Sequence, residues 1–358
     1  MAVDERTKKL AKLVVNYSLF VKPHENVVIS GSTEAEPFII ALYEEILKAD
    51  AHPILRLTIP GLNPIFYKYA KEHHLQKFPE YFDYMVKNAQ KYIGINTASN
   101  TKELSNVDPA KISARGKINH PIIEYIVNEK EKIRRCTVGY PSIAKAQEAG
   151  MSLADYEDFV FAAELQDWPK LAKEMEKVAK KFRKGKEVHL LGENVDLKMR
   201  IHGDKAITSK GHENMPDGEI FMAPVRESVE GWIKFDYPAI ESGNEVEGIE
   251  VHFQKGKAVD IKAEKNEKFL KQMLSIDENA SYVGELGIGM NPKIKKFTKD
   301  LLFDEKIGGT IHLAFGMAYK ENGGGNDSSL HWDIVKDMHH GQIILDGKIV
   351  QKNGKWIL

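Results

Sequence analysis

Three segments near the C-terminal end alternate bulky apolar residues with small or polar ones. They are Tyr282–Met290, Ile311–Tyr319 and Leu330–Val335. Because successive side chains of a strand point to opposite faces, this period of two predicts a β-strand in each segment. The bulky side chains that share one face are Leu286, Ile288, Met290, Ile311, Leu313, Phe315, Met317, Leu330, Trp332 and Ile334. We expect this face to pack into a hydrophobic core.

The opposite face of the same strands combines small residues with side chains that bind metal ions. It consists of Glu285, Gly287 and Gly289, of His312, Ala314, Gly316 and Ala318, and of His331 and Asp333. Carboxylates and imidazoles in an otherwise apolar sheet would be costly without partners. Small neighbours leave room for an ion and a substrate, so the pattern predicts a functional site on this face.

The first half of the chain alternates helical and strand patterns. The predicted helices are Asp4–Phe20, Glu34–Lys48, Tyr81–Gln90 and Pro121–Lys132, followed by helices within Ser142–Lys184 that are broken near Asp167–Pro169. The predicted strands are Asn26–Ser30, His52–Thr58, Lys91–Ala98 and Arg135–Pro141. Pro121 suits the first position of a helix. Such alternation indicates βαβ units and an α/β domain with a mostly parallel sheet.

The second half has a different pattern, in which strands and turn residues dominate from Lys186 onward. Turn sequences such as Gly192–Asn194 and Asp346-Gly347 separate short apolar segments and predict hairpins. A helix is expected at Asn266–Ser275. We place the boundary where helical periodicity stops, which gives an N-terminal α/β domain at 1–185. The C-terminal domain at 186–358 is then α+β, with a largely antiparallel sheet.

Composition narrows the partners and the compartment. The 51 basic and 52 acidic residues give a net charge of −1, so no basic excess indicates a nucleic-acid partner. No run of about 18 apolar residues occurs, and we therefore expect no membrane span. Cys136 is the only cysteine, which excludes an intramolecular disulfide and fits a reducing, cytoplasmic compartment. High Lys and Glu usage with scarce Cys is typical of a thermophilic source.

The candidate ligands number five when Glu219, in the segment Met215–Pro224, is added to the acidic and imidazole residues of the three strands. They are Glu219, Glu285, His312, His331 and Asp333. Such ligands suit divalent ions of the Zn, Co, Mn or Mg type. Five exceed what one closed site needs, and with one bridging carboxylate they suit two ions about 3.5–4 Å apart.

Other interpretations of these residues stay open at this point. A single strand histidine can be purely structural, a buried glutamate can pair with Arg or Lys, and the spacing His331-x-Asp333 occurs by chance. A mononuclear Fe(II) oxygenase would use His331, Asp333 and His312 as a facial triad. It would leave Glu219 and Glu285 without a task, and His312 precedes the H-x-D pair rather than following it. A non-enzymatic binding module is the third possibility.

Several motifs taken together resemble the thermophilic aminopeptidase family of metallopeptidases. They are Leu10–Ile29, Met215–Gly231, Tyr282–Gly289, His312–Tyr319 and Asn326–Val335, which span most of the chain. The resemblance implies an N-terminal α/β domain and a C-terminal catalytic domain that holds two divalent ions. It also implies an intracellular homodimer that removes N-terminal residues from peptides with a free N-terminus.

The resemblance also implies a role for each matching residue. Glu219, His312, His331 and Asp333 would be metal ligands, and Glu285 would be the carboxylate shared by both ions. Hydrolysis would use a water or hydroxide that bridges the metals, and Tyr319 would donate to the developing oxyanion. Nearby acids such as Asp217 are expected to lie exposed in a loop. The chain departs from the family in its compact Glu321–Asn326 link and in Trp332, which leave the ligands intact.

Overall fold

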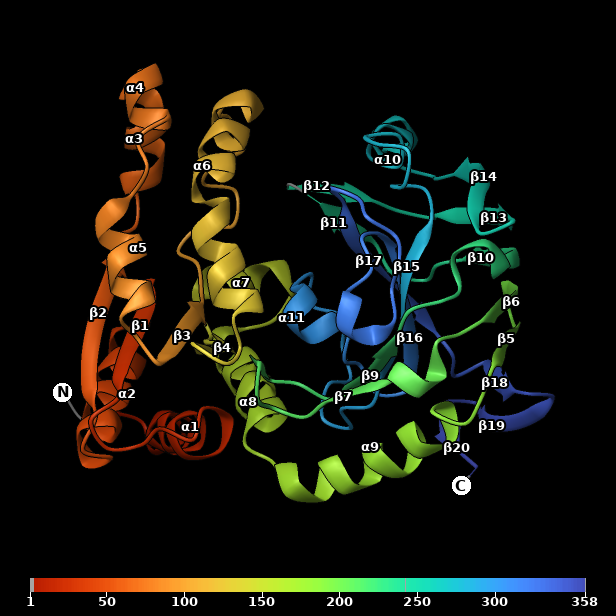
Figure 1. Cartoon of the computed structure of the whole chain (residues 1–358), viewed down its shortest axis with the longest axis horizontal. Coiled ribbons are helices and arrows are strands. Elements are labelled where there is room, and N and C mark those ends of the chain that lie inside the picture. The colour runs from red at the N-terminus through yellow and green to blue at the C-terminus, as the bar shows by residue number, and fades with distance from the viewer. Residues whose placement is uncertain (1–2, 242, 358) are drawn as a thin grey trace. The chain divides into compact units, whose positions relative to one another are not determined.

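The computed structural model describes residues 3–241 and 243–357, which form two compact units (Figure 1). The first unit contains Met1–Gln166 and Gly211–Pro216, and the second contains Asp167–Lys210 and Asp217–Leu358. Helix α9 (Trp168–Phe182) therefore lies in the second unit, whereas the sequence placed the boundary after residue 185. The reason is its apolar face: Met175 and Phe182 are fully buried, and the helix contacts strands of the second unit.

The sheet of the first unit is parallel throughout, with strand order β2-β1-β3-β4-β8. Its strands are β1 (Asn26–Ser32), β2 (His52–Thr58), β3 (Lys91–Asn96), β4 (Arg134–Gly139) and β8 (Asn214–Met215). Parallel neighbours need long crossover connections, and helices supply them here. This confirms the predicted α/β class with βαβ units.

Helices cover both faces of this sheet. Val28 packs with Val86, Ile122 and Ile126 from helices on one face, and Val27 on the other face is also fully buried. The helices of the unit are α1 (Glu5–Leu13), the π-helix η1 (Val14–Ser18), the 3₁₀ helix η2 (Thr33–Ala35), α2 (Glu36–Lys48), α3 (Leu62–Tyr69), α4 (Glu72–Leu75), α5 (Glu80–Lys87), α6 (Pro109–Asn128), α7 (Ile143–Glu148) and α8 (Leu153–Glu164).

The prediction that a helix starts at Pro121 is wrong. Helix α6 begins at Pro109, and Pro121 lies inside it. The Asp108 carboxylate accepts a hydrogen bond of 2.9 Å from the Ala110 amide, so Asp108 caps the helix and Pro109 takes the first position. The Asp-Pro pair is thus the stronger start signal, and the helix tolerates one missing N–H at Pro121.

The second unit contains a long antiparallel sheet with strand order β14-β13-β10-β6-β5-β18-β19-β20. Its strands are β5 (Glu187–Gly192), β6 (Val195–Arg200), β10 (Glu230–Lys234), β13 (Glu250–Gln254), β14 (Lys257–Lys262), β18 (Gly341–Leu345), β19 (Lys348–Lys352) and β20 (Lys355–Trp356). The predicted hairpins are present, since β5 pairs with β6 and β18 with β19. A smaller pair joins β11 (Ala239–Glu241) and β12 (Asn244–Val246).

A further antiparallel sheet in this unit carries the predicted ligands, with order β17-β16-β15-β9-β7. Its strands are β7 (Ile207–Ser209), β9 (Glu219–Met222), β15 (Val283–Gly289), β16 (Thr310–Gly316) and β17 (His331–Asp337). The predicted apolar face is buried: Phe315 stacks on Phe253 of β13, with ring centroids 5.8 Å apart. The two sheets therefore share a core. Met290 and Met317, at the strand ends, are only half-buried.

Short helical segments connect the strands of the second unit. Besides α9 they are η3 (Gly203–Lys205), η4 (Arg226–Ser228), α10 (Glu267–Met273), α11 (Leu301–Asp304) and η5 (Lys320–Asn322). Helix α10 confirms the helix predicted at Asn266–Ser275. Helix α11 precedes the turn that leads into β16, and η5 lies in the link between β16 and β17. Both are therefore close in sequence to the ligand-bearing strands.

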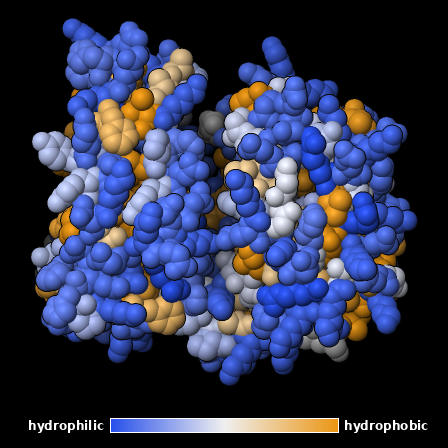
Figure 2. Space-filling view, viewed as in Figure 1, coloured by the Kyte–Doolittle hydropathy of each residue, from blue (hydrophilic) through white to orange (hydrophobic). Residues whose placement is uncertain are grey.

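The visible surface is mainly hydrophilic, with scattered apolar residues (Figure 2). Within the part of the chain that the structure describes, no helix combines the length and the apolar character needed to cross a membrane.

Candidate metal centre

Strand register brings the predicted ligands to one face of the sheet. Asp333 on β17 and Glu285 on β15 both lie opposite Ala314 of β16, the strand between them. His312 lies two residues before Ala314 and therefore on the same face. Glu219, the first residue of β9, pairs with Gly289 of β15. Four neighbouring strands thus each contribute ligand candidates.

His312 lies at the centre of the cluster. Its Nε2 is 3.4 Å from Glu219 Oε2 and 3.6 Å from Glu285 Oε1. The same nitrogen is 3.8 Å from Asp333 Oδ1. His331 joins at the far side, with Nε2 3.4 Å from Asp333 Oδ2. The structure therefore brings all five predicted ligands together.

The small residues of this face make the space that the ligands occupy. Gly287 lies directly opposite His312, and a Cβ at position 287 would overlap the imidazole. Ala314 separates Glu285 from Asp333 with only a methyl group between them. The small residues in the sequence pattern thus leave the space in which the imidazole and the carboxylates can lie side by side.

Backbone carbonyls fix the orientation of both imidazoles. His312 Nδ1 donates to the Glu305 carbonyl at 3.1 Å, and His331 Nδ1 donates to the Met317 carbonyl at 2.9 Å. Because a carbonyl only accepts, the proton of each neutral ring lies on Nδ1. Each Nε2 then points at the carboxylates with its lone pair available, which is the orientation that metal-binding histidines need.

Burial and mutual charge shift every titratable group of the cluster. Burial raises the pKa of Glu219 well above its usual range and raises that of Glu285 too. Burial acts against the charged imidazoles, but the carboxylates nearby raise the pKa of His312 to about 9 and that of His331 to about 10. Burial also opposes ionisation of Asp333, yet His331 lowers its pKa to about 2. Protons therefore bind where a divalent ion would compete with them.

The donor set fits divalent metal ions. Glu219 Oε2 and Asp333 Oδ1 are buried and accept no hydrogen bond in the described structure. A buried carboxylate oxygen that accepts no hydrogen bond is costly, and such atoms mark places where a ligand or ion completes the site. Oxygen and imidazole nitrogen are the donors that Zn, Co, Mn and Mg accept, so these residues can hold the ions that the sequence predicts.

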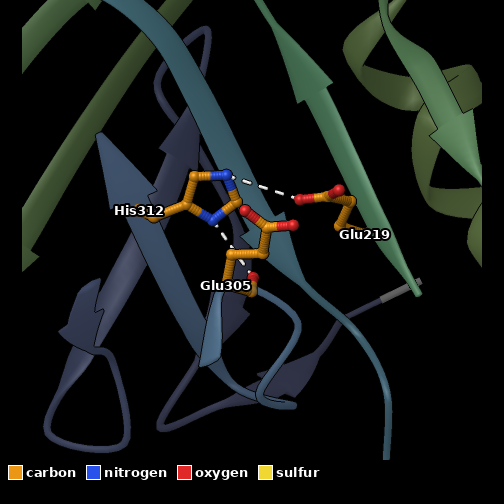
Figure 3. A group of neighbouring side chains, drawn as sticks. All are labelled: Glu219, Glu305 and His312. Atoms are coloured by element: carbon orange, nitrogen blue, oxygen red, sulfur yellow. Dashed lines mark hydrogen bonds and ion pairs between the residues drawn. The ribbon is translucent and has the colours of Figure 1, made fainter. Parts of the chain in front are cut away.

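Sequence reasoning missed three polar residues at this site. Glu305 places its carboxylate beside Glu219 and His312 (Figure 3), and Lys306 forms an ion pair with Glu305. Asn322 Nδ2 donates to Glu285 Oε2 at 3.2 Å. Glu305 and Lys306 lie in a turn outside the period-two pattern, and Asn322 lies in the compact link. No local signal in the sequence identifies them.

Two further expectations concern residues beside the ligands. Tyr319, predicted to lie near the metals, has its ring centroid 5.1 Å from that of His331. Asp217, expected to be an exposed loop acid, is fully buried and accepts a hydrogen bond of 3.0 Å from Ser209 Oγ. The prediction for Asp217 was wrong because the residue, although it lies in the loop before β9, is buried rather than exposed to solvent.

A cavity of about 830 Å³ in the second unit lies away from the cluster. Leu171 of α9, Met290, Ile307 and His339 are among its lining residues, and none of the five predicted ligands lines it. A narrower pocket of about 20 Å³ borders Asp333 and Asp304. The five predicted ligands therefore do not line the larger cavity.

The fold and the donor set on this antiparallel sheet are those that a metal-dependent enzyme needs. Residues 3–356 match the family described as Thermophilic metalloprotease (M29), and the chain belongs to that family. The resemblance seen in the sequence motifs is thereby confirmed.

Similar proteins extend over the full chain. Aminopeptidase T of Thermus aquaticus is 28% identical over 413 residues, with 100% of both chains covered. Aminopeptidase AmpS of Bacillus subtilis (strain 168) is 26% identical, with 99% of this chain and 100% of the relative covered. Among solved structures, wild-type AmpT from Thermus thermophilus is 25% identical with a TM-score of 0.86 and covers 100% of both chains.

A second solved structure is similar in fold alone. It is a 2,5-dihydroxypyridine dioxygenase from Pseudomonas putida KT2440, 14% identical with a TM-score of 0.59, covering 98% of this chain and 96% of that one. Since fold does not fix function, the chemistry must be argued from the ligands.

Proposed function

We propose that this protein is a two-metal aminopeptidase that removes N-terminal residues from peptides. The observation that carries the proposal is the cluster of two imidazoles and three carboxylates around His312, which exceeds the needs of one ion. The relatives named aminopeptidases support the same activity. The non-enzymatic alternative is not supported, because the chain belongs to a family of metalloproteases.

The arrangement of the ligands supports a division into two halves. His331 and Asp333 lie on one side of the cluster, and Glu219 with His312 lies on the other. Glu285 is within reach of both, with Oε1 3.6 Å from His312 Nε2 and its carboxylate in one group with His312 and Asp333. We assign Glu285 as the carboxylate shared by both ions, which are divalent ions of the Zn, Co, Mn or Mg type.

The residues around the site suit hydrolysis at a free N-terminus. When bound, two divalent ions would lower the pKa of water and polarise the scissile carbonyl. Glu219, Glu285 and Asp333 would hold the ions so that one of them accepts the lone pair of a free α-amine, which an acylated nitrogen no longer offers. Tyr319, whose ring lies beside that of His331, would donate a hydrogen bond from its phenol to the charge that develops on the carbonyl oxygen.

We also infer that the protein works as a homodimer in the cytoplasm of a thermophile. The family resemblance supports the dimer, and the single Cys136 supports a reducing compartment. Sedimentation equilibrium measures the oligomer directly: a mass of about twice 40.5 kDa is expected, and one chain mass at micromolar concentration would contradict it.

A mononuclear Fe(II) oxygenase would use His312, His331 and Asp333 as a facial triad, in which His312 Nε2 lies 3.8 Å from Asp333 Oδ1. The similarity to the dioxygenase is one of fold alone and does not favour this chemistry. The triad leaves Glu219 and Glu285 as buried carboxylates without a task, which counts against it.

A pair of matched substrates tests the proposed function. Dialysed protein is assayed with an aminoacyl amide that has a free amine and with its N-acetylated twin. We expect cleavage of the free-amine substrate alone, loss of activity with a chelator, and recovery with Zn, Co, Mn or Mg. Equal cleavage of both substrates, or none after every metal is restored, would contradict the proposal.

A further inference from the structure

The narrower pocket of the second unit borders the sheet face that carries the predicted ligands. Val335 forms part of its wall, and it lies on this face because it pairs with His312 and follows Asp333 by two residues. Asp333 itself borders the pocket, and its Oδ1 is buried and accepts no hydrogen bond in the described structure. The pocket therefore begins beside the candidate metal centre.

The rest of the pocket wall is mainly apolar. Its apolar side chains are those of Pro238, which precedes β11, of Ile240 in β11, of Phe297, which precedes α11, and of Leu301, which begins α11. Phe297 stacks on Tyr237 with ring centroids 4.9 Å apart, and this contact holds the wall in place. Such a surface favours an apolar group over a hydrated charged one.

Two further charged side chains line the pocket, and each has a partner of its own. Lys299 Nζ lies 2.8 Å from Glu245 Oε1. The Asp304 carboxylate accepts hydrogen bonds from the Thr298 amide at 2.7 Å and from Thr298 Oγ1 at 2.9 Å. These contacts fix the segment that carries Leu301. They also mean that an entering group meets an apolar surface rather than an open charge.

The pocket is small, and Leu301 limits it on the solvent side. Its volume is about 20 Å³. Since a cavity needs about 10–15 Å³ to hold one water molecule, little more than a methyl-sized group fits. Leu301 lines the pocket and is nevertheless 43% exposed. Shortening this side chain should therefore lengthen the pocket without opening the core of the unit.

We propose that this pocket receives the side chain of the substrate's N-terminal residue and selects small apolar side chains such as that of alanine. The carbon that bears this side chain lies between the α-amine and the scissile carbonyl, so the side chain must project from the metal centre into space beside a ligand. The pocket at Asp333 is apolar space in that position, whereas the larger cavity borders none of the five predicted ligands. The inference rests on the proposed function and deepens it, because it names the class of substrate.

The test compares alaninamide with leucinamide in wild type and in L301A. We expect wild type to prefer alaninamide in kcat/KM by about 10-fold or more, because small differences in side-chain size are worth about 10- to 200-fold in a closed pocket. L301A should reduce this preference about 10-fold by raising kcat/KM for leucinamide. Its metal content should equal that of wild type, since Leu301 is none of the predicted ligands.

A binding measurement gives a second readout that does not depend on turnover. Calorimetry of metal-loaded protein with the amino alcohols alaninol and leucinol should show the same preference in wild type and the same reduction in L301A. I240A shortens another wall residue and should shift both readouts in the same direction. It keeps the test available if L301A does not fold.

Ile349 provides the matched control. It lies in β19 of the same unit, is exposed to 41%, much as Leu301 is, and does not line the pocket. I349A should keep the wild-type ratio of alaninamide to leucinamide in both hydrolysis and binding. A shift in I349A as large as that in L301A would mean that any loss of apolar surface changes selectivity, and the assignment of the pocket would fail.

The outcomes separate this inference from the proposed function. A wild type that prefers leucinamide, or unchanged ratios in both L301A and I240A, would overturn the inference while the aminopeptidase activity remains. The inference would also be overturned if L301A changed selectivity only for the second residue in a series of alanyl dipeptides, because the pocket would then hold the leaving part of the substrate. If wild type cleaves no free-amine substrate after metal is restored, the proposed function fails instead.

Discussion

His312 contacts three carboxylates through a single nitrogen, so the whole cluster depends on where its ring lies. Its Nδ1 donates a hydrogen bond to the Glu305 carbonyl, and its other edge fits only because Gly287 has no side chain. The first condition is directional and the second is steric. At the scale of residues, a substitution that moves this ring should therefore remove metal binding before it removes the fold.

Substitution G287A tests the space beside His312. The added Cβ would overlap the imidazole, so the ring must move away from the carboxylates. We expect loss of at least one bound ion and of most activity, with a loss of unfolding free energy of about 1–3 kcal/mol from overpacking. Metal analysis and urea unfolding measure the two effects.

Gly94 provides the control for this substitution. It also lies in a buried sheet, but a Cβ there would be 3.6 Å from the nearest atom, which is ordinary contact. The G94A variant should keep its ions and activity. Normal metal binding in G287A would show that the imidazole has other room, and the steric account of the site would then fail.

At the scale of elements, side-chain hydrogen bonds hold the link between β16 and β17 in place although it is rich in glycine. The Arg226 guanidinium donates to Asn326 Oδ1 at 3.0 Å and lies 4.0 Å from the centroid of the Tyr282 ring. Asn322 of the same link donates to Glu285. The link therefore acts as part of the site, and its compactness brings polar groups onto the ligands.

Asp277 fastens the C-terminal end of this link just before His331. Its carboxylate accepts from the Ser329 amide at 2.8 Å and from Ser328 Oγ at 2.9 Å. Burial opposes ionisation of Asp277, but these hydrogen bonds outweigh it and lower its pKa to about 2. Because the pKa is lower in the folded protein, the stabilisation is present above the ordinary pKa of about 4 and is lost as pH falls towards 2.

The D277N variant should therefore be less stable than wild type by about 1 kcal/mol at pH 7. The difference should shrink between pH 5 and pH 3, where wild-type Asp277 begins to lose its advantage. Urea unfolding of both proteins at several pH values measures this. A difference that stays constant down to pH 3 would mean that the charge of Asp277 does not fasten the link.

At the scale of the whole molecule, the sequence predicted the ligand sheet better than its surroundings. The period of two places β15, β16 and β17 within three residues of the observed ends, because register on a buried face is tightly specified. Glu305, Lys306 and Asn322 were not predicted because their partners, Glu219 and Glu285, are distant in sequence. The unit boundary also depends on distant partners, since α9 joins the unit in which its apolar face is buried.

Metal removal should affect the two units unequally. The predicted ligands come from β9, β15, β16 and β17 of the second unit. When the free concentration of an ion is a thousand times its dissociation constant, its binding stabilises the unit by about 4 kcal/mol. After chelation we expect faster amide hydrogen exchange in these strands and unchanged exchange in β1–β4. Hydrogen exchange followed by mass spectrometry resolves the two units. Equal acceleration in both, or none, would contradict a centre confined to the ligand sheet.

The most direct test of the central claim is the number of ions bound by wild type and by E285Q, measured together with hydrolysis of the free-amine substrate. We expect about two ions per wild-type chain and activity that needs both. We expect a folded E285Q protein that has lost metal and hydrolysis together, because the shared carboxylate is gone. Retained hydrolysis in metal-loaded E285Q, or a single iron in the wild type, would contradict a two-metal centre bridged by Glu285.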